Sequence, residues 1–128
     1  MAELKFFFDY RGPYAYLAHT QLRGCGARIR YFPFDIRALM EKVGNVPTSV
    51  ICKAKNRYVQ ADLRRWAAHY KVPFQRHPDI LEIDFNRLLR ATLCASELAP
   101  VGGVVTALFS AVWGEPEPLK TPSDVTAI

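Results

Sequence analysis

The first 34 residues read as a strand, a helix and a second strand, and everything after them reads as helix. The short aromatic run Leu4–Tyr10 predicts a buried or half-buried strand. Apolar residues then recur at helical spacing over Pro13–Arg23, where the proline suits a first turn and Gly24 suits the stop. Arg28–Phe34 alternates charged and apolar side chains, so we expect a second strand, parallel to the first.

Beyond residue 35 the apolar spacing is helical. The strongest pattern is Lys55–Tyr70, whose apolar face includes Tyr58 and Trp66. We expect both of these aromatic side chains in the core, together with Trp113. The predicted helices are Ile36–Val43, Lys55–Tyr70, Phe85–Ala99 capped by Asp84, Val104–Trp113, and one that begins after a Thr121 cap.

Two strands and several helices make a poor closed sheet. A lone parallel pair leaves two unpaired edges and little surface for packing. Three arrangements would solve this problem: further chain supplies strands, another subunit supplies them, or helices cover the pair. The residues leave all three open. At 128 residues the chain is expected to form one compact unit.

The charge balance favours anionic partners. Seventeen lysines and arginines against 12 aspartates and glutamates give a formal net charge of +5. Nucleic acids, small carboxylates and a tripeptide thiol all fit such a surface. The cations are scattered, so we expect a solvated face and no nucleic-acid site. We also expect no membrane contact and a cytoplasmic location, because no run of about 20 apolar residues and no signal peptide is present.

The three cysteines do not form a known redox or metal pattern. Cys25, Cys52 and Cys94 lie far apart, with no CxxC pair and no histidine at metal-ligand spacing. This disfavours a disulfide framework, a zinc site and dithiol exchange, and we expect no metal. Cys25 lies between two glycines near Arg23, which fits either a reactive thiol or an ordinary loop thiol.

Five short motifs occur in a fixed order along the chain, and together they resemble one known family. They are Phe6-Phe7-Phe8-Asp9-Tyr10-Arg11-Gly12-Pro13-Tyr14-Ala15-Tyr16-Leu17-Ala18, Tyr31-Phe32-Pro33-Phe34, Gly44-Asn45-Val46-Pro47, Ala54-Lys55-x-x-Tyr58 with Asp62-Leu63-x-Arg65-Trp66-Ala67, and Ala111-Val112-Trp113-Gly114. The family is that of the 2-hydroxychromene-2-carboxylate isomerases and the related kappa-class glutathione transferases. The resemblance covers nearly all of this chain but only the first part of the family's usual length.

The resemblance implies an α/β fold of the thioredoxin-like, DsbA-like type. Residues 1–35 would form its βαβ opening, and residues 36–128 an inserted helical domain, within one compact unit overall. The C-terminal strands of the family fold would be missing from this chain. Because kappa-class relatives form dimers, the resemblance also implies a homodimer.

The resemblance further implies a function in aromatic degradation. The family isomerises a chromene carboxylate, an aromatic ring-cleavage product, to a trans-benzylidenepyruvate, with glutathione as the thiol cofactor. The partners of this chain would then be a small aromatic carboxylate and glutathione. Independently, the start of a helix presents free N–H groups and a partial positive charge, and both lower the pKa of a thiol placed there.

The implied site lies at the start of the first helix. The family has a serine that orients the glutathione thiolate, and this chain has Gly12 at that position. Arg11 is the neighbouring candidate, since it could supply charge to a thiolate or carboxylate. The implied glutathione-binding residues are Pro13, Tyr14, Asn45 and Lys55.

Because Gly12 has no hydroxyl, three functions stay open. The first is a glutathione-dependent isomerase. The second is a catalytically impaired or truncated family member that binds glutathione or another anion. The third is a kappa-like glutathione transferase that acts on other electrophiles. Binding of glutathione and a screen of substrates would separate them.

Overall fold

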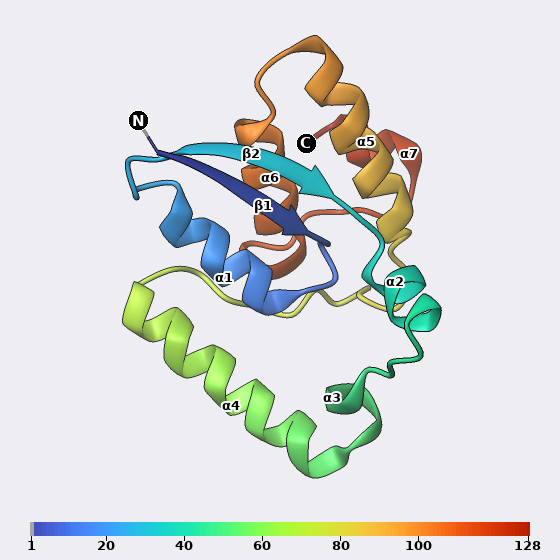
Figure 1. The fold of residues 1–128 in the computed structure, drawn as a ribbon. Coiled ribbons are helices and arrows are strands. Elements are labelled where there is room, and N and C mark those ends of the chain that lie inside the picture. Colours follow the sequence, from blue (N-terminus) through green and yellow to red (C-terminus); the bar gives the residue numbers. More distant parts are fainter. Residues whose placement is uncertain (1) are drawn as a thin grey trace.

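The structure, a computed structural model, describes residues 2–128 and opens with the predicted strand, helix and strand (Figure 1). These elements are β1 (Glu3–Phe8), α1 (Pro13–Leu22) and β2 (Arg28–Pro33). The two strands pair in parallel, with Phe6 opposite Tyr31, as the sequence predicted. Within the described residues they form a sheet of two strands, in the order β1-β2.

Helices make up most of the remaining structure. The predicted helices are confirmed with boundaries shifted by a few residues, and one further helix, α3, was not predicted. A π-helix, η1, continues α6 where one long helix was expected. The elements are α2 (Ile36–Lys42), α3 (Thr48–Ile51), α4 (Lys53–Tyr70), α5 (Phe85–Leu98), α6 (Gly102–Phe109), η1 (Ser110–Gly114) and α7 (Pro122–Thr126).

Side chains placed at helix starts account for several of these boundaries. Asp35 accepts a hydrogen bond from the backbone N–H of Ala38 and begins α2, and Asp84 does the same for Arg87 and begins α5. Thr121 begins α7 in a capping box, in which its hydroxyl accepts from the Asp124 amide and the Asp124 carboxylate accepts from the Thr121 amide. Each cap satisfies a backbone N–H that the helix itself cannot pair.

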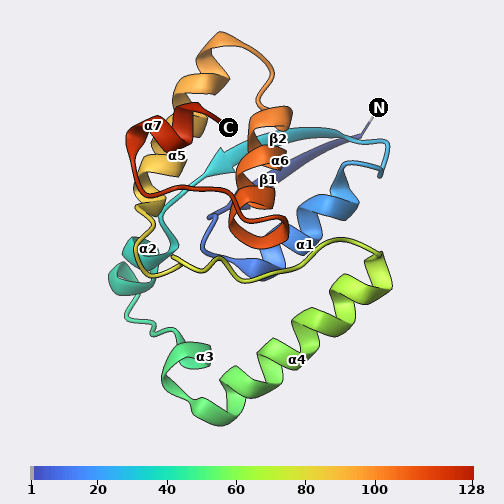
Figure 2. The same cartoon turned by 180° about the vertical axis from the view of Figure 1, so that it is seen from behind.

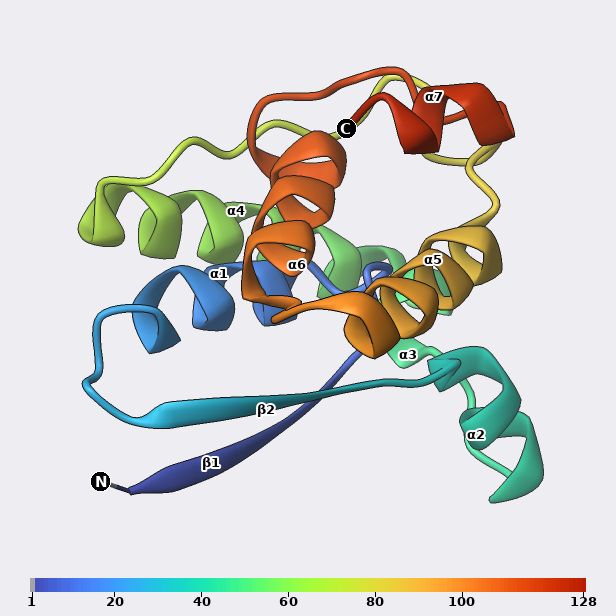
Figure 3. The ribbon, with the colours of Figure 1, turned by 90° about the horizontal axis from the view of Figure 1, so that it is seen from above.

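Only one face of the small sheet is covered. In Figure 3, α1 and α6 lie over one side of β1 and β2, and α4 lies beyond α1. On the opposite face Phe7 is 61% exposed and stacks on Phe32, with ring centroids 4.8 Å apart. Among the described residues, helices therefore cover one face of the strand pair, which is one of the three arrangements expected from the sequence.

The core forms where the end of β1 meets α6 and η1. Phe8, Tyr10 and Phe109 are almost completely buried and pack ring against ring, with centroids 4.8 to 5.5 Å apart. The indole N–H of Trp113 donates to the carbonyl oxygen of Tyr10 at 2.8 Å. The Tyr10 hydroxyl shares a hydrogen bond with Thr92 at 2.7 Å, and burial raises the pKa of Tyr10. The prediction that Trp113 lies in the core is confirmed.

The prediction for the other two aromatic residues is wrong. Tyr58 is 62% exposed and Trp66 is 43% exposed. Both lie on α4, which runs along the edge of the molecule next to α1 (Figure 2). Because α4 has a neighbour on one side, only a narrow stripe is fully buried, and that stripe consists of Leu63 and Ala67.

Within residues 2–128, no helix is long and apolar enough to cross a membrane.

Candidate functional site

Gly12 begins α1 directly after the turn that ends β1. Its backbone is extended, with φ −90° and ψ 108°, and its amide donates to the Asp9 carbonyl oxygen at 3.0 Å. Pro13, the first helical residue, has no N–H to donate. Since Gly12 carries no side chain that could cap the helix, the first-turn amides of Tyr14 and Ala15 are left for water or an anion.

The backbone does not require glycine at position 12. Its φ lies in a region open to any residue. A Cβ at this position would lie 3.4 Å from the Cβ of Ala15 and 3.4 Å from the carbonyl oxygen of Asp9, which is ordinary contact. An added Cβ would therefore fit here without moving the backbone.

Asp9 organises the turn before α1. Its side chain is 3% exposed and accepts hydrogen bonds from the amides of Arg11, at 3.0 Å, and Ile36, at 2.9 Å. It also forms an ion pair with the Arg11 guanidinium. One carboxylate thus joins the end of β1 to the starts of both α1 and α2.

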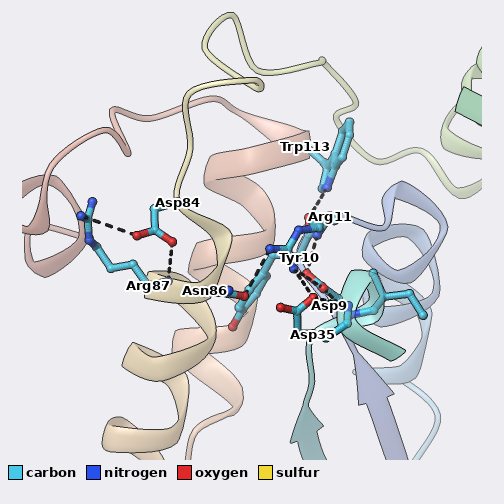
Figure 4. Close-up of polar contacts among 10 residues, drawn as sticks. Asp9, Tyr10, Arg11, Asp35, Asp84, Asn86, Arg87 and Trp113 are labelled. Carbon is cyan, nitrogen blue, oxygen red and sulfur yellow. Dashed lines mark hydrogen bonds and ion pairs between the residues drawn. The ribbon is translucent and has the colours of Figure 1, made fainter. Parts of the chain in front are cut away.

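The Arg11 guanidinium is held inside the protein. Figure 4 shows it close to Asp9, Asp35 and Asn86, and its Nη1 atom lies 3.4 Å from Asp35 Oδ1. Its Nη2 atom donates to Asn86 Oδ1 at 3.2 Å, and the group lies 5.3 Å from the ring centre of Phe85. Two carboxylates therefore face one guanidinium, so its charge is already compensated before any ligand binds.

Asp35 both caps the start of α2 and pairs with the Arg11 guanidinium. The backbone N–H of Ala38, which it caps, and the positive charge of Arg11 hold the pKa of its carboxyl below the usual range. The carboxylate is therefore ionised at neutral pH beside the start of α2. Together with Asp9, it supplies a second negative charge beside the Arg11 guanidinium.

Tyr14 connects α1 to α4. Its hydroxyl donates to Asp62 Oδ2 at 2.6 Å, although the side chain is 43% exposed. Loss of solvent, followed by the hydrogen bond and the negative charge of Asp62, raises the pKa of Tyr14 to about 12. The hydroxyl therefore stays protonated at neutral pH and acts as a donor.

Asn45 and Lys55 are exposed and make local contacts. Asn45 Oδ1 accepts from the amide of Val46 at 2.9 Å, and the Lys55 ammonium donates to the Thr48 hydroxyl. Lys55 and Asp62 lie seven positions apart on α4, so they share one helix face about 10 Å apart along the axis.

Of the six candidates from the sequence, the four over 11–14 lie together at the start of α1. Tyr14 reaches α4 through Asp62, and the contacts of Asn45 and Lys55 stay within α2–α4 and their connections. The sequence analysis missed Asp35 and Asn86, the partners that fix Arg11. Asp35 directly precedes a predicted helix, a cap signal that would have drawn attention to it. Asn86 carries no comparable signal.

Comparisons with known proteins give one consistent picture. The family model for the DSBA-like thioredoxin domain matches residues 3–128. A 2-hydroxychromene-2-carboxylate isomerase from Pseudomonas sp. (strain C18) is 31% identical over 117 residues, which is 86% of this chain and 53% of the relative. Glutathione S-transferase kappa 1 from Caenorhabditis elegans is 32% identical over 89 residues, which is 64% of this chain and 38% of the relative.

A solved structure of a 2-hydroxychromene-2-carboxylate isomerase is also similar. It superimposes with a TM-score of 0.81 at 29% identity, over 98% of this chain and 64% of the solved chain. The chain thus spans about half the length of the Pseudomonas relative and under two thirds of the solved one. The mixed α/β, DsbA-like thioredoxin fold expected from the sequence is confirmed.

Proposed function

This chain belongs to the family of DSBA-like thioredoxin domains, and from that premise we propose that it carries the thiol site of a glutathione-dependent isomerase of the 2-hydroxychromene-2-carboxylate type. The observation that carries the proposal is the start of α1, where Gly12 leaves the first-turn amides without a side-chain cap. The similarity to isomerases supports the substrate, a small aromatic carboxylate.

The residues at the start of α1 fit a bound thiol. The Tyr14 and Ala15 amides offer two donors, and the helix dipole favours a negative charge at the same point. Both effects lower the pKa of a thiol held there. When bound, glutathione supplies the thiolate nucleophile for reversible addition to an unsaturated acid.

The other residues hold this geometry. Asp9 fixes the turn that aims the amides, and Pro13 presets the first helical turn. We assign Arg11 to this support, because its charge is compensated by Asp9 and Asp35. Lys55 is an exposed cation on the α4 face that also carries Asp62, so it is our candidate for binding a carboxylate of glutathione or substrate.

The aromatic part of the substrate has a candidate surface on α4. Tyr58 and Trp66 expose large fractions of their rings, and flat aromatic acids stack on such surfaces. Asn45 adds a side-chain amide that would donate to a ligand oxygen while its own oxygen stays bonded to Val46.

We further propose that the protein is a homodimer located in the cytoplasm. Within each chain, residues 1–35 and 36–128 would form two units. Exposed apolar side chains around α3 support association: Val46, Val50 and Ile51 are 53%, 71% and 67% exposed. Sedimentation of the chain and of the Val50→Asp, Ile51→Asp variant would test the dimer. A monomer for both would remove this part of the proposal.

The proposal is tested by titrating the 128-residue chain with reduced glutathione in a calorimeter. The control ligand is the analogue in which a methyl group replaces the thiol. We expect both to bind, and the ultraviolet absorbance of the thiolate to appear at lower pH when glutathione is bound. Failure of glutathione to bind would overturn the proposed function.

Substrate assays then separate the candidate functions. Turnover of 2-hydroxychromene-2-carboxylate supports the isomerase. Turnover of other electrophiles alone favours a kappa-like transferase, which the nematode relative supports. If the chain binds glutathione without turning over any substrate, and turnover appears in the Gly12→Ser variant, the site is impaired and lacks only the hydroxyl.

A further inference from the structure

A groove of about 820 Å³ runs along the outer side of β2. Its walls are residues 22–23 and 27–32, together with Ser96 and residues 99–102, where the end of α5 leads into α6. The start of α6 packs on Tyr31, because a Cβ added to Gly102 would lie 3.6 Å from the Tyr31 hydroxyl. None of the residues lining this groove belongs to the α1 site described above.

The backbone of β2 presents a free edge to this groove. Within residues 2–128, β1 is the sole strand paired with β2. The amides of Arg28 and Phe34 donate to the carbonyl oxygens of Ala2 and Phe8, so the even-numbered residues of β2 face β1. In a parallel ladder the alternate residues point the other way, and Ile29 and Tyr31 therefore direct their N–H and C=O groups outward.

The side chains of β2 alternate between the two faces of the sheet. Arg28 and Arg30 are exposed on the open face, opposite Glu3 and Lys5 of β1. Ile29 and Tyr31 are half-buried, and Tyr31 contacts His19 of α1 and Gly102 of α6, so this alternate set lies on the covered face. A strand laid along this edge would alternate in the same way, with every second side chain beside an arginine.

The charge along this edge is positive. Arg23, Arg28 and Arg30 line the groove, and the lining contains no acidic residue. The nearby acid Glu3 lies 3.4 Å from Arg30 in an exposed pair. Lys5, opposite Arg30, adds a further cation on the open face.

We propose that this groove docks an extended segment of a partner protein in which acidic and apolar residues alternate. The segment adds to the sheet as a strand beside β2. Its backbone pairs with Ile29 and Tyr31, its acidic side chains meet Arg28 and Arg30, and its apolar side chains meet the covered face. Pairing of this kind obtains affinity from main-chain bonds and specificity from alternate side chains.

The first test uses a short fluorescein-labelled peptide of alternating Glu and Val, measured by fluorescence anisotropy with the 128-residue chain. The control peptide has the same composition, with all Glu residues in one block and all Val residues in the other. We expect saturable binding of the alternating peptide and roughly tenfold weaker binding of the blocked one, since register decides which face each side chain meets. Equal binding of both peptides would mean non-specific charge attraction and overturn the proposal.

The second test changes the protein. The Arg28→Ala, Arg30→Ala variant is expected to weaken peptide binding roughly fivefold to twentyfold, the effect of two exposed cross-strand charge pairs. The matched control is Arg57→Ala, Arg64→Ala on α4, which removes the same charge from exposed positions outside the groove. An equal loss in both variants would contradict a specific site. All four positions are exposed, so circular dichroism is expected to show both variants folded.

The third test distinguishes strand pairing from side-chain contact alone. In an added strand the amides of one alternate set face β2 and those of the other set face away. Two peptides are compared, one N-methylated at every Glu amide and the other at every Val amide. We expect one of them to lose binding and the other to keep it. Equal effects would overturn strand addition.

A second copy of the chain is the alternative occupant. If the alternating peptide does not bind and the chain forms dimers that the Ile29→Pro variant abolishes, the edge pairs with itself and the proposal is wrong. Glutathione titration of the same preparations reports on the α1 site separately.

Discussion

The Asp9 carboxylate accepts a hydrogen bond from the Ile36 amide at 2.9 Å, and this contact joins the end of β1 to the start of α2. The same carboxylate holds the amide and the guanidinium of Arg11. Three segments of the candidate site therefore depend on one buried side chain. Arg11 would lose its main partner if that side chain were removed.

We expect Asp9→Ala to lower the free energy of unfolding by about 3 kcal/mol, because a largely buried guanidinium loses its closest carboxylate and two amides lose their acceptor. Urea unfolding followed by circular dichroism measures this change. Asp62→Ala is the matched control, since its hydrogen bond to Tyr14 is exposed, and it is expected to cost at most about 1 kcal/mol. Equal losses in the two variants would show that Asp9 does not organise the site.

Gly12→Ser is expected to leave the fold intact and to raise the free energy of unfolding by a few tenths of a kcal/mol, since serine is a slightly better helix cap than glycine. The added Cβ meets its neighbours at 3.4 Å, and the backbone is already extended. Thermal unfolding compares this variant with Gly12→Ala, which fills the same space without a cap and is expected to be less stable than Gly12→Ser. A destabilised Gly12→Ser with a stable Gly12→Ala would contradict the geometry described for this turn.

The sequence was sufficient to predict the elements around the site, because local rules decide them. Aromatic strand residues, a proline in the first turn of α1 and the Asp84 cap act over a few positions, and each appears in the structure. The partners of Arg11 could not be found in this way. Asp35 and Asn86 lie 24 and 75 positions away, and only the packing of α2 and α5 against the end of β1 brings them together.

Helical periodicity also identified the buried stripe of α4 but overestimated its width. A pattern of apolar residues cannot tell how many neighbours a helix has. Leu63 and Ala67 face α1 and are buried, whereas Tyr58 and Trp66 lie beside the stripe and stay exposed. Exposed aromatic residues at these positions are what makes α4 a candidate surface for an aromatic substrate.

Gly114 is required by a close approach in the core. A Cβ at this position would lie 2.8 Å from the Tyr16 hydroxyl, which donates to the carbonyl oxygen of Pro73. We expect Gly114→Ala to lower the free energy of unfolding by roughly 1 to 3 kcal/mol through overpacking. The measurement is a urea double-mutant cycle with Tyr16→Phe, which removes the hydroxyl.

In the Tyr16→Phe background the same Gly114→Ala change should cost less, because the atom it meets is gone. An unchanged cost in that background would place the origin of the effect elsewhere in η1.

His19 makes stability depend on pH. It is 2% exposed, and its Nε2 atom lies 2.9 Å from the Tyr31 hydroxyl. Burial, followed by the positive charge of Arg23, lowers the pKa of His19 from 6.5 to about 4. Between about pH 4 and pH 6.5 the unfolded chain binds a proton that the folded chain does not. The free energy of unfolding therefore falls as the pH decreases from about 6.5 to about 4, and the loss is complete below about pH 4.

The size of this effect follows from the shift. At about 1.4 kcal/mol for each pKa unit, the loss attributable to His19 is roughly 3 kcal/mol. Urea unfolding of the wild type and of His19→Gln, at neutral pH and at pH near 4, isolates it, because glutamine keeps a polar group without titrating. We expect the wild type to lose roughly 3 kcal/mol more than the variant between these conditions. Parallel losses in both proteins would show that the acid sensitivity comes from carboxylates and that His19 is protonated as readily in the folded protein as in the unfolded chain.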